Sequence, residues 1–114
     1  MKVAHNSEIP AAKMDVPGAE KVTIRWLVGE KDDPPNFYMR EFEIEQGGCS
    51  PRHEHDYEHE VYVLEGEGSV FGGGGEKPLR PGSAVLVQPG EEHQFRNTGD
   101  GPLRFLCLVP KDAT

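Results

Sequence analysis

The sequence predicts an all-β protein built as a double-sheet jelly roll, and three observations carry this prediction. Short stretches rich in β-branched and aromatic residues recur along the chain, with the apolar and polar alternation of half-buried strands. Fourteen glycines and ten prolines among 114 residues indicate many turns. No stretch has convincing helical periodicity. Short antiparallel strands of this kind pack as two facing sheets.

The chain is predicted to contain an N-terminal arm, residues 1–20, followed by a single domain, residues 21–114. Pro10, Pro17 and Gly18 interrupt the arm, so that we expect at most one short strand there. A length of 114 residues suits one domain with one modest core. His5 lies in the arm, away from the other histidines, and is not expected to be a ligand.

Seven segments of the domain are predicted to be strands. The segment 37–45 has two faces, and the more apolar one, with Tyr38, Phe42 and Ile44, should face the core. Arg40 shares that face, where it would either form a salt bridge near the rim or face the interior and hold an anionic substrate. Gly72–Gly75 fits a hairpin turn better than a phosphate-binding loop. The predicted strands are residues 21–28, 37–45, 61–65, 69–71, 84–88, 93–96 and 103–109.

A histidine-dense stretch lies at the centre of the chain, with His53, His55 and His59 within seven positions. If residues 53–55 are extended, His53 and His55 point to the same side, because side chains alternate along a strand. Residues 56–58 would then form a bend, and His59 would begin the next strand facing the same space. His93 follows a later turn and precedes another strand. Four converging imidazoles predict a site for a divalent transition metal.

Two glycine-punctuated motifs surround these histidines. In the first, five residues separate Gly47 from His53, three separate His55 from His59, and six separate His59 from Gly66. In the second, Gly82 is followed after five residues by Gln88, and then by Gly90, His93 and Asn97.

These motifs resemble, in order and spacing, the two motifs of the cupins. His59 stands where the first cupin motif has glutamate, and Gln88 where the second has proline. The resemblance extends from about Lys21 to Lys111 and is strongest to small single-domain cupins with an all-histidine manganese site. It implies the cupin double-stranded β-helix, a jelly-roll barrel, for residues 21–114. It also favours manganese or iron as the metal, one ion per chain, whereas imidazole chemistry leaves zinc, nickel and copper as alternatives.

Glu60 competes with His59 for the role of third ligand, because it also fits the spacing after His55. It does not fit the six-residue spacing to Gly66, and it should face away from His59 in a strand. We therefore predict the ligands His53, His55, His59 and His93.

The same alternation suggests which side chains line a pocket beside the metal. If His93 faces the metal, Phe95 does so too, and on the last strand Phe105, Cys107 and Val109 share one face. The resemblance favours this face as the cavity wall. Cys107 is then either a small buried hydrophobe or an oxidation target beside the metal. Tyr57, in the bend between ligands, is either a gate or an exposed aromatic.

Composition narrows the class of partner. The net charge of −8 is unfavourable for binding a phosphate backbone or an anionic membrane surface. No apolar run could span a bilayer, and residues 1–7 lack a signal-peptide core, so that a cytoplasmic location is predicted. In that compartment Cys49 and Cys107 should be reduced, and a disulfide is not expected.

The function predicted first is a metal-dependent oxygenase or related oxidoreductase, dioxygenase-like, acting on a small organic substrate. A non-catalytic metal-binding or ligand-binding module or sensor, and a metal-dependent isomerase or lyase, remain as alternatives, because cupins host all of these. The resemblance also implies a homodimer, with Trp26 and Leu27 as candidates for its surface.

Overall fold

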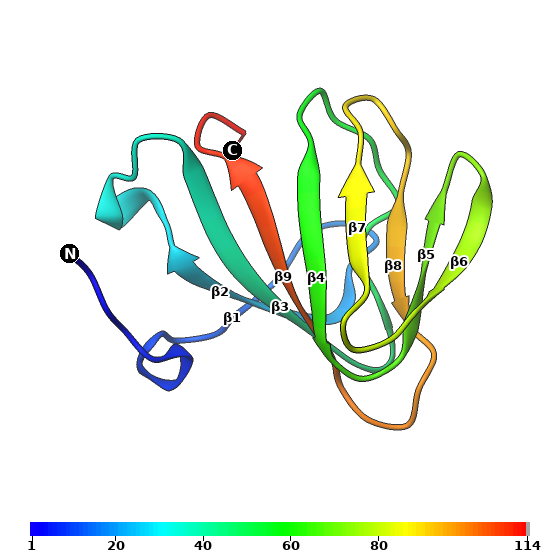
Figure 1. The fold of residues 1–114 in the computed structure, drawn as a ribbon. Coiled ribbons are helices and arrows are strands. Elements are labelled where there is room, and N and C mark those ends of the chain that lie inside the picture. Colours follow the sequence, from blue (N-terminus) through cyan, green and yellow to red (C-terminus); the bar gives the residue numbers. More distant parts are fainter. Residues whose placement is uncertain (114) are drawn as a thin grey trace.

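The computed structural model describes residues 1–113 and confirms the all-β jelly-roll prediction. Nine antiparallel strands form one sheet that curls into a half-barrel (Figure 1). The strands are β1 (Ala12–Lys13), β2 (Glu20–Val28), β3 (Phe37–Cys49), β4 (His59–Glu65), β5 (Gly68–Gly72), β6 (Gly75–Leu79), β7 (Ala84–Val87), β8 (Gln94–Asn97) and β9 (Leu103–Pro110). Two single-turn 3-10 helices, η1 (Asn6–Glu8) and η2 (Glu30–Asp32), are the helical segments of the described chain, and neither has the length or apolarity to cross a membrane.

The long strand β3 connects the two halves of the curl. The strand order is β6-β5-β8-β3-β9-β4-β7, with β2 pairing β3 and β1 pairing β2. Residues Phe37–Ile44 of β3 pair with β9, whereas Cys49 at its end pairs with Arg96 of β8. In Figure 1, β9, β4 and β7 therefore stand on one side of the curl and β8, β5 and β6 on the other.

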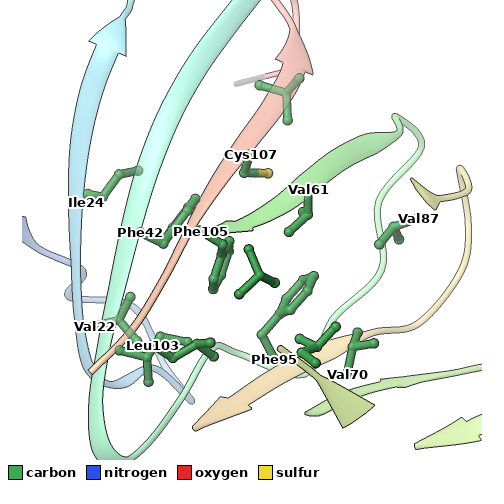
Figure 2. Close-up of a cluster of buried hydrophobic side chains, with 14 of the residues drawn as sticks. Val22, Ile24, Phe42, Val61, Val70, Val87, Phe95, Leu103, Phe105 and Cys107 are labelled. Carbon is green, nitrogen blue, oxygen red and sulfur yellow. The ribbon is translucent and has the colours of Figure 1, made fainter. Parts of the chain in front are cut away.

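The core lies inside the curl and follows the predicted alternation. Every second residue of β9 is buried, from Leu103 to Val109. The rings of Phe42 and Phe95 both stack on Phe105, with centroid distances of 5.4 Å and 4.9 Å (Figure 2). The predicted inward face of β3 is confirmed, since Tyr38, Arg40, Phe42 and Ile44 are all buried.

Strand β6 was not predicted from the sequence. It contains Pro78, which lacks the N–H that a central strand needs, and it lies at the edge of the sheet, where it pairs only with β5. The glycine run is a hairpin turn, as predicted, with Gly72 paired to Gly75.

The N-terminal arm lies against the outer face of the sheet. Its short strand β1 pairs with Thr23 and Ile24 of β2. The Arg25 side chain donates a hydrogen bond to the Ile9 carbonyl at 3.0 Å. His5 accepts a hydrogen bond from the Ser7 amide and caps η1.

Candidate metal centre

Backbone hydrogen bonds join the two histidine motifs directly. The amides and carbonyls of His53 and His93 exchange hydrogen bonds of 3.1 Å and 2.9 Å, and the Gly90 amide donates to the His55 carbonyl at 2.7 Å. Residues 50–58 are therefore held by an isolated bridge, and the continuous strand assumed for His53 and His55 does not form. The bend predicted for residues 56–58 is present at Asp56 and Tyr57, and His59 begins β4 as predicted.

Two further residues of the motifs, Gly90 and Asn97, hold the backbone around the histidines in place. Gly90 has a φ of +80°, a backbone conformation that glycine adopts without strain, and this turn presents the amide bonded to His55. The Asn97 side-chain amide is buried and donates to the carbonyls of Ile44 and Gly101, each at 2.8 Å. Asn97 thereby fixes the corner after β8.

The four predicted ligands gather inside the curl. One ring nitrogen each from His53, His55 and His93 lies within 4.8 Å of the other two. His59 adjoins this group, with its Nε2 2.7 Å from the Nε2 of His55. His93 and His59 are buried, His55 is half-buried and His53 is exposed, so that the cluster has a closed side and an open side.

Hydrogen bonds and burial prepare these imidazoles for a metal ion. His55 Nδ1 lies 3.1 Å from the Tyr57 carbonyl and His93 Nδ1 lies 2.9 Å from the Glu91 carbonyl, which leaves both Nε2 atoms as lone-pair donors. Partial desolvation of its ring inside the cluster, with a smaller contribution from the charge of His93, lowers the pKa of His53 to about 4. Burial and then the charge of Arg40 lower the pKa of His59 to about 3. Neutral imidazole is the form that binds metals.

The donor set fits a divalent transition metal ion. It consists of imidazole nitrogens, and nitrogens 2.7 Å apart are close enough to share one cation. The rival ligand Glu60 is exposed on the outer side of β4, whereas His59 is 6% exposed on the inner side.

Arg40 is buried beside the cluster. Its Nη2 donates to Cys107 Sγ at 3.1 Å and lies 3.3 Å from His59 Nδ1. Within residues 1–113 it forms no ion pair with a carboxylate, and its Nε has no hydrogen-bond partner. The sequence left Arg40 either in a salt bridge near the rim or facing the interior, and its guanidinium faces the interior.

Of the remaining predicted pocket residues, Tyr57 and Phe95 adjoin histidines, and none of the four lines the cavity described below. Tyr57 is half-buried, and its ring stacks on His55 at a centroid distance of 3.9 Å. Phe95, Phe105 and Val109 are each at most 5% exposed and lie in the core.

Sequence reasoning missed a cavity of about 390 Å³ between the β5–β6 hairpin and β7. Its wall includes His93, apolar side chains such as Val85 and Val87, and the charged residues Lys77 and Glu91. Lys77 was missed because β6 was not predicted. The alternation of residues 84–88 could have indicated Val85 and Val87.

Comparison with known proteins places this geometry in a family. The family model described as "Cupin domain" matches residues 40–109, the segment that carries the histidine cluster. The chain belongs to the cupin family. The resemblance carried by the two histidine motifs is therefore confirmed.

Individual cupins similar to this chain differ in their named activities. The polyketide cyclase RemF from Streptomyces resistomycificus is 35% identical, with a TM-score of 0.90 over 96% of this chain and 79% of that structure. The L-ectoine synthase of Mycolicibacterium gilvum is 32% identical over 100% of this chain and 86% of its own length.

A 1-methylthio-D-xylulose 5-phosphate methylsulfurylase from Rhodospirillum rubrum is 35% identical over 62% of this chain. The match covers 46% of that protein, so that the chain spans about half the length of this relative. Together these matches show that homologues of this cupin bind small molecules.

Proposed function

We propose that this cupin is a metal-dependent enzyme that moves a proton from the carbon next to a carbonyl group of a small anionic substrate to a base, for which the cavity wall offers the carboxylate of Glu91. This step underlies both cyclisation and isomerisation. The observation that supports the proposal is the distribution of charge at the site. Four imidazoles without a carboxylate lie beside Arg40, which also lacks a carboxylate partner among the described residues. A negative charge that develops on substrate oxygen here would be stabilised.

His53, His55, His59 and His93 would hold one divalent ion per chain. The resemblance to all-histidine cupins favours manganese or iron, and zinc, nickel and copper fit the same donors. When bound, the ion would supply Lewis-acid polarisation of a carbonyl oxygen.

The chain's own residues would bind and orient the substrate. Arg40 would hold its anionic group, since a guanidinium pairs with carboxylate or phosphate through two parallel hydrogen bonds. The cavity beside His93, at about 390 Å³, is within the range of small-molecule pockets, and both apolar and charged side chains line it.

The similar proteins support this choice of reaction. One carries the name polyketide cyclase and another is named for a phosphate-bearing sugar, and neither name denotes an oxidation.

The experiment follows hydrogen–deuterium exchange at the carbon next to a carbonyl. Metal-loaded protein is incubated in D₂O without oxygen, with a panel of keto acids and aryl diketone carboxylates, and the exchange is read by NMR. We expect metal-dependent exchange at least about 10-fold faster with the acids than with their methyl esters, because the esters cannot pair with Arg40. His93→Ala protein is the control and should lose the exchange together with the metal.

An oxygenase is the second candidate function, and the apolar residues behind the cluster favour it, since Phe95, Phe105 and Val109 offer O₂ a water-poor environment. The oxygenase would be supported over the proposed reaction if the manganese or iron form consumes O₂ and shows no hydrogen–deuterium exchange when O₂ is absent. Melting shifts with ligand but without any turnover would instead indicate a binding module.

We also propose a homodimer. Trp26 is 37% exposed and Leu27 is half-buried on β2, and both belong to the surface expected from the family resemblance. Light scattering should give twice the chain mass for the wild type and the mass of one chain for Leu27→Glu. A monomeric wild type would contradict the proposal.

A further inference from the structure

One lysine of the edge strand β6 lies on the inner face of the curl. Lys77 pairs with Val70 of β5, which in turn pairs with Phe95 of β8, and residues paired across strands share a face of the sheet. Val70 and Phe95 belong to the core and are 9% and 5% exposed (Figure 2). Lys77 therefore ends an apolar row with a cation, at the point where the row reaches the cavity of about 390 Å³.

The nearby carboxylates leave the charge of Lys77 unpaired. Its neighbour Glu76 faces outward and contacts Arg96 at 2.7 Å. Glu91 lies in the cavity wall beside Gly72, at the tip of the β5–β6 hairpin and two residue pairs away from Lys77. Within residues 1–113, Lys77 makes no ion pair. The cavity thus has a positive side at Lys77 and a negative side at Glu91.

A hydroxyl group lines the same cavity from the facing edge of the curl. Ser83 directly precedes β7, and β6 and β7 are the two ends of the strand order. The Ser83 Oγ accepts a hydrogen bond from the Arg80 amide at 3.0 Å, which leaves its own O–H free to donate to a ligand. Ammonium and hydroxyl groups are both donors to carboxylate and phosphate oxygens.

We propose that Lys77 is a specificity-determining residue that binds a second anionic group of the substrate. This inference rests on the proposed function, in which Arg40 holds the first one. Arg40 contacts His59 and does not line the cavity, whereas His93 does. Two cations beside different histidines of one cluster suit two charged groups of one molecule. The substrate class is therefore a keto acid with a further carboxylate or phosphate group.

The test compares α-keto diacids with α-keto monoacids of the same chain length, which end in a methyl group. The diacids are α-ketoglutarate, α-ketoadipate and α-ketopimelate, together with their phosphonate analogues. We expect calorimetric titration of the metal-loaded wild type without oxygen to give a Kd about 10-fold lower for at least one dianion than for its monoacid, because a hydrogen bond to a charged group contributes about this much. The end group that binds more tightly identifies the site as one for carboxylate or for phosphate.

Lys77→Met should abolish this preference and leave the Kd of the monoacids within about 2-fold of wild type, because a methyl end gains nothing from the ammonium. Lys13→Met is the matched control, since Lys13 is an exposed lysine of β1 outside the cavity, and it should keep the preference. Metal affinity should be the same in all three proteins.

Two results would overturn this inference alone. One is equal affinity for dianions and monoacids throughout the series, and the other is a preference that persists in Lys77→Met. A preference that depends on Lys77, in a protein without metal-dependent hydrogen–deuterium exchange, would support the binding site for the second anionic group and overturn the proposed proton transfer.

Discussion

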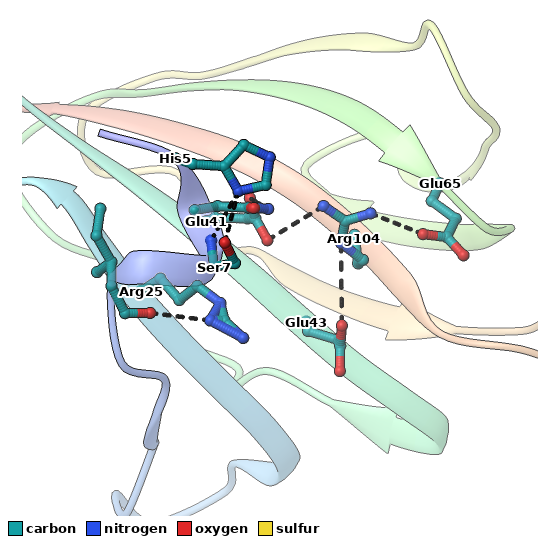
Figure 3. A network of polar contacts seen from close by, with 9 residues as sticks. His5, Ser7, Arg25, Glu41, Glu43, Glu65 and Arg104 are labelled. Atoms are coloured by element: carbon teal, nitrogen blue, oxygen red, sulfur yellow. Dashed lines mark hydrogen bonds and ion pairs between the residues drawn. The ribbon is translucent and has the colours of Figure 1, made fainter. Parts of the chain in front are cut away.

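Two arginines on neighbouring strands occupy opposite environments. Arg104 of β9 lies on the outer face of the sheet, 25% exposed at its side chain, and is surrounded by carboxylates. Its guanidinium contacts Glu65 at 2.8 Å, Glu41 at 3.2 Å and Glu43 at 3.9 Å (Figure 3). Arg40 of β3 lies on the inner face, is 7% exposed, and contacts an imidazole and a thiol.

The difference separates a structural charge from one available to a ligand. The Arg104 contacts join β3, β4 and β9, and the hydrogen bond with Glu65, followed by the charge of Glu41, raises the pKa of Arg104. A buried charge without a counter-ion costs stability. The Arg40 guanidinium lies 5.5 Å and 5.0 Å from the ring centroids of Trp26 and Phe42, and such contacts offset only part of the cost of a buried charge. This lack of a counter-ion is consistent with the proposed role in binding an anion.

The largest expected effect is that of Arg40→Met on catalysis. Turnover of an anionic substrate should fall about 100-fold or more, as for other losses of a group that stabilises developing charge. The free energy of unfolding should stay within about 1 kcal/mol of wild type or rise, because an apolar side chain of similar length replaces an unpaired buried charge. Steady-state kinetics measure the turnover and urea unfolding measures the stability. A large loss of stability in Arg40→Met would show that Arg40, like Arg104, has a structural role.

Arg104→Met should show the reverse pattern. Glu41, 7% exposed, would lose its charged partner, and we expect the free energy of unfolding to fall by about 1–3 kcal/mol. Metal affinity and turnover should match the wild type, since Arg104 lies on the outer face. Urea unfolding and metal titration measure the stability and the metal affinity of this variant. A variant that loses metal affinity but keeps its stability would contradict the prediction.

The pH dependence of stability in the metal-free protein should also distinguish Arg40 from Arg104. The pKa values of His53 and His59 are lowered to about 4 and about 3, against 6.5 in the unfolded chain. Below pH 6.5 the unfolded chain thus binds protons that the folded chain does not, and the free energy of unfolding should fall between pH 6.5 and about pH 3. Chemical unfolding at several pH values in a chelating buffer should show a smaller fall for Arg40→Met, because Arg40 contributes to the lowered pKa of His59. Arg104→Met should reproduce the wild-type slope.

The smallest expected effect is that of salt. Raising NaCl from about 0.05 M to 0.5 M should reduce the stability difference between wild type and Arg104→Met by a few tenths of a kcal/mol, since partly exposed ion pairs are screened. The difference between wild type and Arg40→Met should not change, because that guanidinium is shielded from mobile ions. Equal salt dependence for both variants would contradict the expected difference between the partly exposed Arg104 and the buried Arg40.

Much of the fold could be predicted because local patterns and tertiary structure agree. Alternation assigned the inward faces of β3 and β9, and the motif spacing indicated which histidines gather. Strand β6 could not be predicted, because Pro78 argues against a strand and only pairing with β5 reveals the edge.

The surroundings of the histidines were less predictable than the histidines themselves. The segment around His53 is held by a bridge to His93, which local periodicity cannot reveal because it forms between residues distant in sequence. The choice for Arg40 between a salt bridge and an interior position likewise depended on whether a carboxylate of another strand lay within reach. The sequence alone does not fix such a distance.

The hydrogen bonds between His53 and His93 also bear on the order of folding. They join segments separated by four strands, β4, β5, β6 and β7, so that we expect the cluster to be complete only after these strands have packed. Contacts of this sequence separation form slowly, and those made after the transition state affect unfolding more than folding. A bound ion should consequently leave the refolding rate almost unchanged and slow unfolding, so that the metal acts mainly by lengthening the lifetime of the native state.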